Sequence, residues 1–361
     1  MSLFDDEQLI SGDCPLVVLQ LGTGHRERLV IFLPGAIHMG RIAYGHPGSR
    51  DEDFLAHWFD RTGHPFAAYS YPAVPGDPVF DVVDPALELA DFCDAVARHA
   101  AGVVTAQQLP AEVIVVAWSA LGNSAPLLRH HLEANGLDLG TFVSLAATPP
   151  LPNLILGSLD TTAATVGASS DLTPGGLLRH GSLRSDNFYG ELRTIATTLG
   201  REVIDPDSYA RHHLADMPMN LFPGLEARRR GDETEVGHAG PLAASHGARW
   251  AEYPLCAALR PTEPNDARHV VTDRHNWAMV NANTIYWRWI GPASPTELAP
   301  TAWERAADVA DELASSLHST VPGGHFFFVG EPGARATVDL VLELDRRRSV
   351  LQSRLLELLS A

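Results

Sequence analysis

The 361-residue chain contains no lysine, so its 26 Lys and Arg side chains are all arginines. This absence excludes Schiff-base and pyridoxal catalysis, which need a lysine amine. It also excludes the phosphate-binding lysine of a P-loop and the strand lysine of protein kinases. The sequence has no apolar run of about 18 residues, so we expect no membrane-spanning helix and no membrane partner.

Cysteine is scarce as well. Cys14, Cys93 and Cys256 form no CxxC pair and no zinc-ligand spacing, so we expect neither a disulfide framework nor a metal site or other cofactor. The acidic start MSLFDDEQLI does not read as a secretory leader, which favours a cytoplasmic location. The formal charge of −18 repels phosphates and argues against a nucleic-acid partner. A small-molecule substrate is the expected partner.

The most informative stretch is AEVIVVAWSALGNSAPLLR, residues 111–129. The apolar β-branched run 113–116 leads into Trp118-Ser119-Ala120, and a helix-compatible segment follows at once. A serine between a buried strand and a helix, with small residues around it, is typical of a nucleophile elbow. Such a turn lifts the hydroxyl above the sheet and aims the next backbone N–H groups at an oxyanion formed beside it.

Strands alternate with helices in the first part of the chain, which predicts an α/β fold with a mostly parallel sheet flanked by helices. The expected strands are 14–20, 28–33, 65–71, 113–116 and 141–147, and the expected helices are 54–61, 85–101 and 126–134. The alternation breaks over residues 151–281, which we interpret as a large helical lid. Residues 1–150 and 282–361 would then be the two parts of the core.

The second part of the core is expected to hold strands at 284–290 and 318–321 and a long C-terminal helix at 334–359. That helix carries an apolar stripe that includes Val338, Val341, Leu351 and Leu355. Such a stripe is explained either by packing on the protein's own core or by a homodimer contact.

Three motifs occur in this order along the chain: Phe32–Ala36, Ser119 and Thr320–Phe326. Each joins a strand to a loop, and together they resemble the α/β-hydrolase family, in particular its esterases and thioesterases. The Trp118-Ser119 pair is similar to the elbows of thioesterases, including those that release polyketide and peptide chains. The resemblance covers residues 14–150 and 282–345.

This resemblance implies Ser119 as the nucleophile and His325 as its general base. The backbone N–H groups of Ala36 and Ala120 would form the oxyanion hole. The sequence departs from the family pattern at Leu121, where a glycine usually stands. Either the strand–helix crossing is more open here, or Gly122 takes the place of that glycine.

The catalytic acid is the larger departure. The family places an aspartate after the strand that precedes the histidine strand, and residues 291–297 have Ser294 there, with Glu297 as the nearest acid. We therefore take Glu297 as the candidate acid, while a simple helix N-terminal charge is the structural alternative. A second alignment takes 255–259 as the strand and Asp266 as the acid, but it requires a long insertion before His325. A Ser–His dyad without a carboxylate is the third alternative.

These residues support three hypotheses. The first is a serine hydrolase or acyltransferase acting on an ester or thioester of a bulky, largely apolar acyl group, such as a natural-product chain. The second is a lyase, isomerase or cyclase that activates a carbonyl without an acyl-enzyme, which an incomplete triad would favour. The third is a non-catalytic binding protein, against which the Ser119–His325 pair argues.

Overall fold

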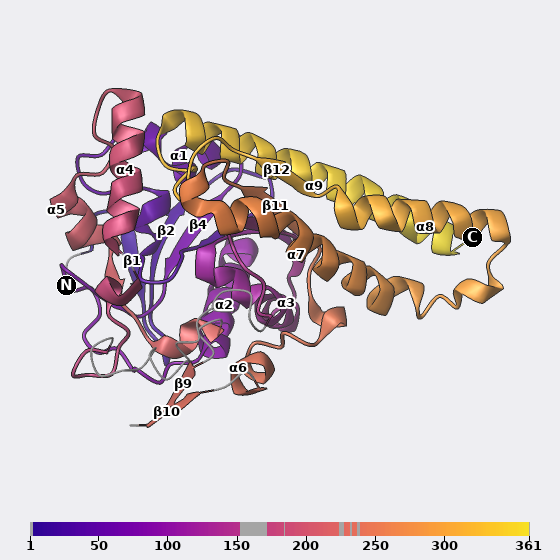
Figure 1. The fold of residues 1–361 in the computed structure, drawn as a ribbon, viewed down its shortest axis with the longest axis horizontal. Helices are drawn as coiled ribbons and strands as arrows, with labels where there is room; N and C mark the ends of the chain where they lie inside the picture. The colour runs from indigo at the N-terminus through magenta and orange to yellow at the C-terminus, as the bar shows by residue number, and fades with distance from the viewer. Residues whose placement is uncertain are drawn as a thin grey trace.

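The computed structural model describes residues 3–151, 172–183, 185–223, 227–231, 233–236 and 239–360. Its main sheet has eight strands in the order β1-β2-β4-β3-β6-β7-β11-β12, with helices on both faces (Figure 1). The first two pairs, β1 with β2 and β2 with β4, are antiparallel, and the remaining pairs are parallel. The predicted α/β class with a mostly parallel sheet is confirmed.

The strands of the main sheet are β1 (Glu7–Ile10), β2 (Leu16–Leu21), β3 (Val30–Leu33), β4 (Phe66–Ser70), β6 (Glu112–Trp118), β7 (Asp138–Leu145), β11 (Cys256–Arg260) and β12 (His318–Thr320). Two smaller pairs are formed by β5 (Val74–Pro75) with β8 (Ala215–Asp216), and by β9 (Ala227–Arg230) with β10 (Glu233–Val236). The helices are α1 (Leu55–Arg61), α2 (Leu89–Gln107), α3 (Ala125–Ala134), α4 (Ser185–Leu199), α5 (Pro206–Ser208), α6 (Ala239–Ala244), α7 (Ala267–Ile285), α8 (Pro300–Ser315) and α9 (Glu331–Ser360).

Helices α1 and α9 pack together above the sheet in Figure 1, and α2 and α3 pack together below it. The sheet is therefore covered on both sides. This is why β3 is buried throughout and β6 from Val113 to Trp118, since a central parallel strand needs apolar side chains on both faces. Helix α2 begins later than predicted, because Glu88 and Asp91 form a capping box at its first turn.

The parallel strands bring several loops to one edge of the sheet. The carboxyl ends of β3, β6, β11 and β12 lead directly into the segments that carry Ala36, Ser119, Asp266 and His325. At the opposite edge, Asp345 of α9 accepts hydrogen bonds from Thr141 Oγ1 (2.6 Å) and Arg348 Nη2 (2.9 Å). This buried contact anchors the helix that follows the His325 loop.

The predicted strand at 284–290 is wrong. Residues 284 and 285 end α7, and Tyr286–Ile290 continue it as a π-helix. The sequence TIYWRWI alternates as a strand would, but no glycine or proline interrupts the chain between Pro264 and Gly291, so the helix continues to that point. Trp287, within this segment, is 56% exposed.

The core resumes earlier than predicted after the insertion. Strand β11 lies within the predicted lid range 151–281, yet it joins the main sheet between β7 and β12. The segment between β7 and β11, residues 146–255, is called the insertion below. Its residues 152–171 lie outside the described part of the chain. The α7–α8 hairpin, residues 267–315, extends away from the sheet together with the end of α9 (Figure 1).

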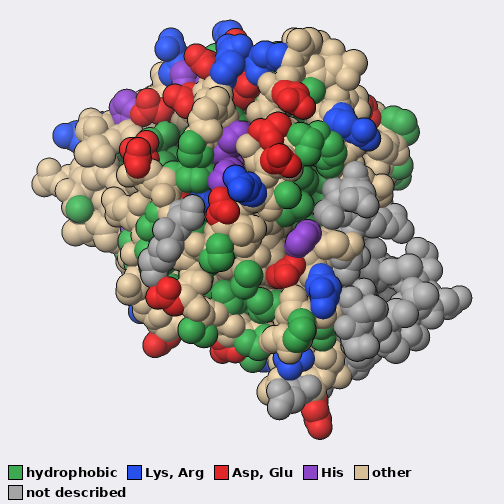
Figure 2. Space-filling model, turned by 90° about the vertical axis from the view of Figure 1, so that its left-hand side faces the viewer, with side chains coloured by type: hydrophobic (Ala, Val, Ile, Leu, Met, Phe, Trp, Pro, Cys, Tyr) green, Lys and Arg blue, Asp and Glu red, His purple; other side chains and the backbone are tan. Residues whose placement is uncertain are grey.

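The apolar stripe of α9 packs within the chain itself, since Val338, Val341, Leu351 and Leu355 are all buried. Intramolecular packing accounts for the stripe, and the homodimer contact stays a prediction. No helix among the described residues is both long and apolar enough to cross a bilayer. On the face seen in Figure 2, acidic and basic side chains are interspersed among hydrophobic ones.

Candidate active site

Ser119 follows β6 directly and has a backbone φ of +55°, a left-handed value that residues other than glycine rarely adopt. Ile37, beyond the end of β3, and Ala146, just after β7, also have positive φ values of 58° and 41°. Three strained positions therefore lie beyond three neighbouring strands of the sheet. Strain of this kind persists only where the surrounding structure enforces it, and it clusters at functional sites.

Two glycines allow the backbone to crowd around Ser119. A Cβ atom on Gly35 would lie 2.9 Å from the Cβ of Ser119. A Cβ atom on Gly122 would lie 2.6 Å from the carbonyl oxygen of Thr148, on the loop after β7. Gly122 therefore occupies the crowded crossing in place of the glycine expected at position 121.

The two predicted oxyanion donors lie on either side of this crowded turn. Ala36 follows Gly35 directly, and its N–H has no hydrogen-bond acceptor within the described part of the chain. Ala120 is the second residue of the 3₁₀ helix Ser119–Ser124, where a backbone N–H has no intrahelical acceptor. Both amides are thus available to a ligand.

His325 lies in the loop after β12 and is 6% exposed. Its Nδ1 is 2.8 Å from Oδ2 of Asp266, the residue that precedes α7. The indole N–H of Trp118 donates to the carbonyl of His325 (3.1 Å), and the two rings lie 5.2 Å apart. The imidazole is therefore paired with a carboxylate and lies beside the residue that precedes Ser119.

The structure does not bring Glu297 to His325. Glu297 ends the exposed 3₁₀ turn Pro295–Glu297 at the outer end of the α7–α8 hairpin, far from the edge of the sheet (Figure 1). The carboxylate at His325 belongs instead to Asp266, the residue of the second alignment. The reason is topological: α7 and α8 both lie between β11 and β12, so the loop just before α8 is not the acid loop.

Three carboxyl groups act electrostatically on His325, and their surroundings shift their pKa values in different directions. Burial raises the pKa of Asp266, but His325, His269 and Arg268 outweigh it and lower that pKa below its ordinary value. Burial raises the pKa of Glu191 and, more strongly, that of Asp273. Asp266 is therefore the one of these three that is favoured in its ionised form, which is the form needed to stabilise an imidazolium.

Asp266, His269 and His325 could in principle hold a metal ion, since their ligand atoms lie within 4.8 Å of one another. His269 Nδ1 is 2.9 Å from Asp273 Oδ2, which leaves its Nε2 as the atom facing Asp266 at 4.0 Å. A guanidinium nitrogen of Arg268 lies 2.6 Å from that Nε2 and occupies its lone pair. A cation already stands where a metal would bind, so we assign these residues no metal role.

The insertion contributes contacts that the sequence did not reveal. From α4, Phe188 stacks on the imidazole of His325, with ring centroids 5.6 Å apart and planes at 16°. Glu191, also on α4, accepts the backbone N–H of His325 at 2.5 Å. Nothing in the local sequence marks these two residues, because their role depends on where α4 docks.

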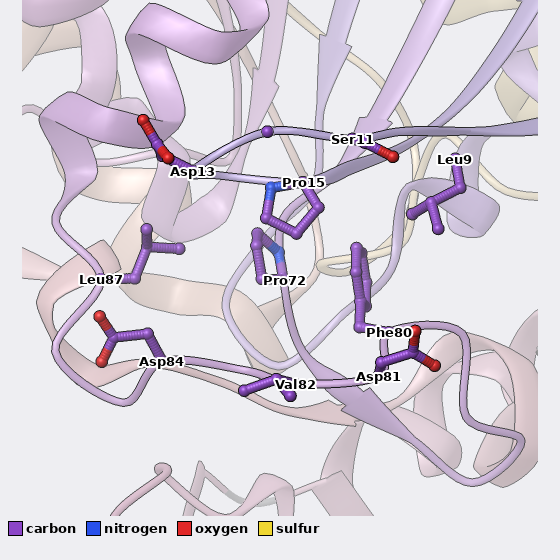
Figure 3. Close-up of a pocket in the computed structure, with 11 residues that line it drawn as sticks. Leu9, Ser11, Asp13, Pro15, Pro72, Phe80, Asp81, Val82, Asp84 and Leu87 are labelled. Atoms are coloured by element: carbon purple, nitrogen blue, oxygen red, sulfur yellow. The ribbon is translucent and has the colours of Figure 1, made fainter.

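A cavity of 380 Å³ lies elsewhere on the molecule, between the first strands and the loop before α2 (Figure 3). Asp13, Asp81 and Asp84 surround an apolar lining that includes Phe80 and Leu87. Its lining contains neither Ser119 nor any histidine. The groups suited to acyl chemistry are therefore those at the carboxyl edge of the sheet.

Comparison with known proteins identifies the fold. A soluble variant of monoglyceride lipase from Saccharomyces cerevisiae has a TM-score of 0.52 and 11% identity, over 94% of each chain. An esterase from Thermogutta terrifontis has a TM-score of 0.49 and 10% identity over 95% of this chain and 98% of that one. The thioesterase domain from the curacin biosynthetic pathway has a TM-score of 0.41 and 11% identity, over 93% and 98%.

The strand order and the likeness to the lipase show that the chain has the α/β-hydrolase fold. Neither a family model nor a curated protein matches its sequence. At 11% identity the likeness extends to the fold alone, so the activity has to be argued from the site.

Proposed function

We propose that this protein is a serine hydrolase or acyltransferase that acts on an ester or thioester. In this mechanism Ser119 Oγ attacks the carbonyl carbon, and His325 takes the hydroxyl proton. The N–H groups of Ala36 and Ala120 bind the resulting oxyanion. His325 then protonates the leaving alcohol or thiol, and water or an acceptor alcohol or amine, deprotonated by His325, releases the acyl group from Ser119.

The observation that carries the proposal is the 2.8 Å contact between His325 Nδ1 and Asp266 Oδ2. A carboxylate in this place fixes the imidazole so that its other nitrogen can act as a base, and it stabilises the imidazolium that forms. The lowered pKa of Asp266 keeps that carboxylate ionised near neutral pH. The second hypothesis, a lyase, isomerase or cyclase, was favoured by the absence of a catalytic acid in the expected loop. The contact of Asp266 with His325 argues against that hypothesis, because it supplies a carboxylate.

We propose further that the insertion serves as a lid and that the acyl group is largely apolar. The surroundings of Trp118 and His325 support this, since the rings of His38 and Phe326 pack against Trp118 and those of Phe188 and Phe326 pack against His325. A substrate carbonyl that binds beside these rings would be removed from water, and the oxyanion donors act more strongly in such surroundings. A bulky acyl chain suits this environment better than a charged one.

The test is covalent labelling of the purified protein with a fluorophosphonate probe, followed by mass spectrometry. We expect one adduct, on Ser119, and its loss in both Ser119→Ala and His325→Ala. Glu297→Gln is the matched control, because that exposed carboxylate should not affect labelling. A folded wild-type protein that is not labelled at Ser119 would refute acyl-enzyme chemistry and favour the lyase, isomerase or cyclase hypothesis or the binding-protein hypothesis.

A further inference from the structure

The hydroxyl of Tyr71 lies against the turn that carries the proposed oxyanion donor. Tyr71 follows β4 and is completely buried. Its Oη donates to the carbonyl oxygen of Gly35 at 2.8 Å and accepts the N–H of His38 at 3.0 Å. Burial raises the pKa of Tyr71, so the hydroxyl keeps the proton that it donates.

The carbonyl that Tyr71 contacts belongs to the same peptide unit as the N–H of Ala36. In a trans peptide these two groups point in opposite directions and share one delocalised system. A hydrogen bond to the oxygen draws electron density from the nitrogen and makes the N–H a stronger donor. The same bond fixes the peptide plane, so the N–H keeps its direction before substrate arrives.

The next peptide unit is held by His38. Its Nδ1 is 2.8 Å from the carbonyl oxygen of Ala36, and its Nε2 is 2.8 Å from the hydroxyl of Tyr209. Burial lowers the pKa of His38 to about 3, so the ring is neutral and carries one N–H. The Ala36 carbonyl can only accept, so Nδ1 donates to it and Nε2 accepts from Tyr209. Side chains thus bind the carbonyls on both sides of the Ala36 N–H.

We propose that Tyr71 is a positioning residue that orients and polarises the Gly35–Ala36 peptide for oxyanion binding. This inference rests on the proposed function, because it assigns Tyr71 a role in the same reaction. Tyr71 does not contact the reacting atoms; it acts through the Ala36 N–H. Its contribution should therefore appear when negative charge develops on the carbonyl oxygen and not when the substrate first binds.

The experiment compares Tyr71→Phe with Tyr69→Phe. Tyr69 lies on β4, is equally buried, and has its hydroxyl 3.0 Å from His99 Nδ1, so it is a matched control for loss of a buried hydroxyl. The probe substrate is p-nitrophenyl butyrate. The second readout is inhibition by 1,1,1-trifluorohexan-2-one, whose adduct with a serine places an oxyanion in the hole.

We expect Tyr71→Phe to lower kcat about tenfold, to leave KM within about twofold, and to weaken inhibition by the trifluoroketone about tenfold. Tyr69→Phe should leave all three within about twofold. Equal effects of the two variants, or a folded Tyr71→Phe with wild-type kcat and inhibition, would overturn the inference and leave the proposed function intact.

Two further results remain informative. If Tyr71→Phe does not fold, 4-fluorophenylalanine at position 71 fills the volume of the hydroxyl without donating a hydrogen bond, and the same changes are expected. If the wild-type protein neither hydrolyses the ester nor is labelled at Ser119, the proposed function fails, and the role of Tyr71 fails with it. That failure is visible in the wild type alone and is therefore distinct from a failure of the Tyr71 variant.

Discussion

The two sides of the candidate site are built differently. On the oxyanion side, fully buried residues hold the turn at Ala36: Tyr71 and His38 bind its carbonyls, and Sδ of Met217, from the insertion, lies 3.0 Å from the backbone nitrogen of Ile37. On the histidine side, half-buried Phe188 and Glu191 of α4 hold His325 from outside the sheet. A cavity of 220 Å³ lies between α4 and the loop at Gly323 and Gly324.

This difference separates a turn that is held by fully buried side chains from a histidine that is held in part by half-buried ones. The oxyanion turn lies among side chains with almost no solvent exposure, so it should keep its shape whenever the protein is folded. His325 donates one hydrogen bond from its ring to Asp266, which belongs to the core, and another from its backbone N–H to Glu191, which belongs to the insertion. The histidine side should therefore respond to changes in how α4 docks.

The largest expected effect comes from the core contact on the histidine side. Asp266→Asn should lower kcat for p-nitrophenyl butyrate by about 10⁴-fold, because the amide cannot stabilise the imidazolium and favours the wrong tautomer. Glu297→Gln is the control and should change kcat by less than about twofold. Comparable losses in both variants would contradict the assignment of Asp266.

A smaller effect is expected from crowding at the elbow. Gly122→Ala should lower the free energy of unfolding by about 2–3 kcal/mol, because the new Cβ would meet the Thr148 backbone oxygen at 2.6 Å and its nitrogen at 2.9 Å. Urea denaturation measures this change. Gly102→Ala in α2, where nothing lies within 4 Å, should be neutral or stabilising. A neutral Gly122→Ala would show that the oxyanion side is less rigid than we infer.

The burial of His38 on the oxyanion side should also make the stability of the protein depend on pH. Burial lowers the pKa of His38 to about 3, from an ordinary value of 6.5 for histidine. Below about pH 6.5 the unfolded chain binds a proton at this position that the folded protein does not. Stability is therefore lost as the pH falls from about 6.5 towards 3, at up to about 1.4 kcal/mol per pH unit.

The variant His38→Gln has no titratable side chain at this position, so its folded and unfolded states no longer differ in a proton bound there. Its free energy of unfolding, measured in urea at pH 7, 6 and 5, should fall less steeply than that of the wild type, by about 1 kcal/mol per pH unit. His275→Gln, at an exposed position of α7, should keep the wild-type slope. An unchanged slope in His38→Gln would mean that His38 takes up its proton in the folded protein.

The smallest effect tests the contribution of the insertion. Glu191→Ala should lower kcat about tenfold, because the backbone N–H of His325 loses its acceptor. Glu191→Gln should restore kcat to within about threefold, since an amide oxygen still accepts a hydrogen bond. Exposed Glu202, just beyond α4, provides the control Glu202→Ala. Equal losses for Ala and Gln at position 191 would argue that the charge matters and not the hydrogen bond.

Much of the fold and of the candidate site could be predicted from the local sequence. The apolar run before Ser119 and the Gly-Gly-His turn at 323–325 each mark a strand followed by a tight loop, so both could be placed at the edge of the sheet. The acid could not be placed in this way. Strand β11 is short, and α7 and α8 separate it from β12, so the choice between Asp266 and Glu297 depends on long-range topology.

The same limit explains the other misses. TIYWRWI has strand-like alternation, and only its continuity with α7 makes it helical. Phe188 and Glu191 acquire a role through the docking of α4 on His325, which no local pattern encodes. Tyr71 is one of several buried tyrosines, and its contact with Gly35 joins segments that are distant in sequence.

The outer end of the α7–α8 hairpin is a suitable place to insert additional sequence. Residues 291–299 form an irregular, largely solvent-facing turn at the greatest reach of the hairpin from the sheet (Figure 1). Such turns tolerate added sequence, because little packing or backbone pairing is lost there. An affinity peptide or a fluorescent reporter inserted beside Ser294 should leave the proposed activity unchanged, and the protein could be immobilised on a support through that point.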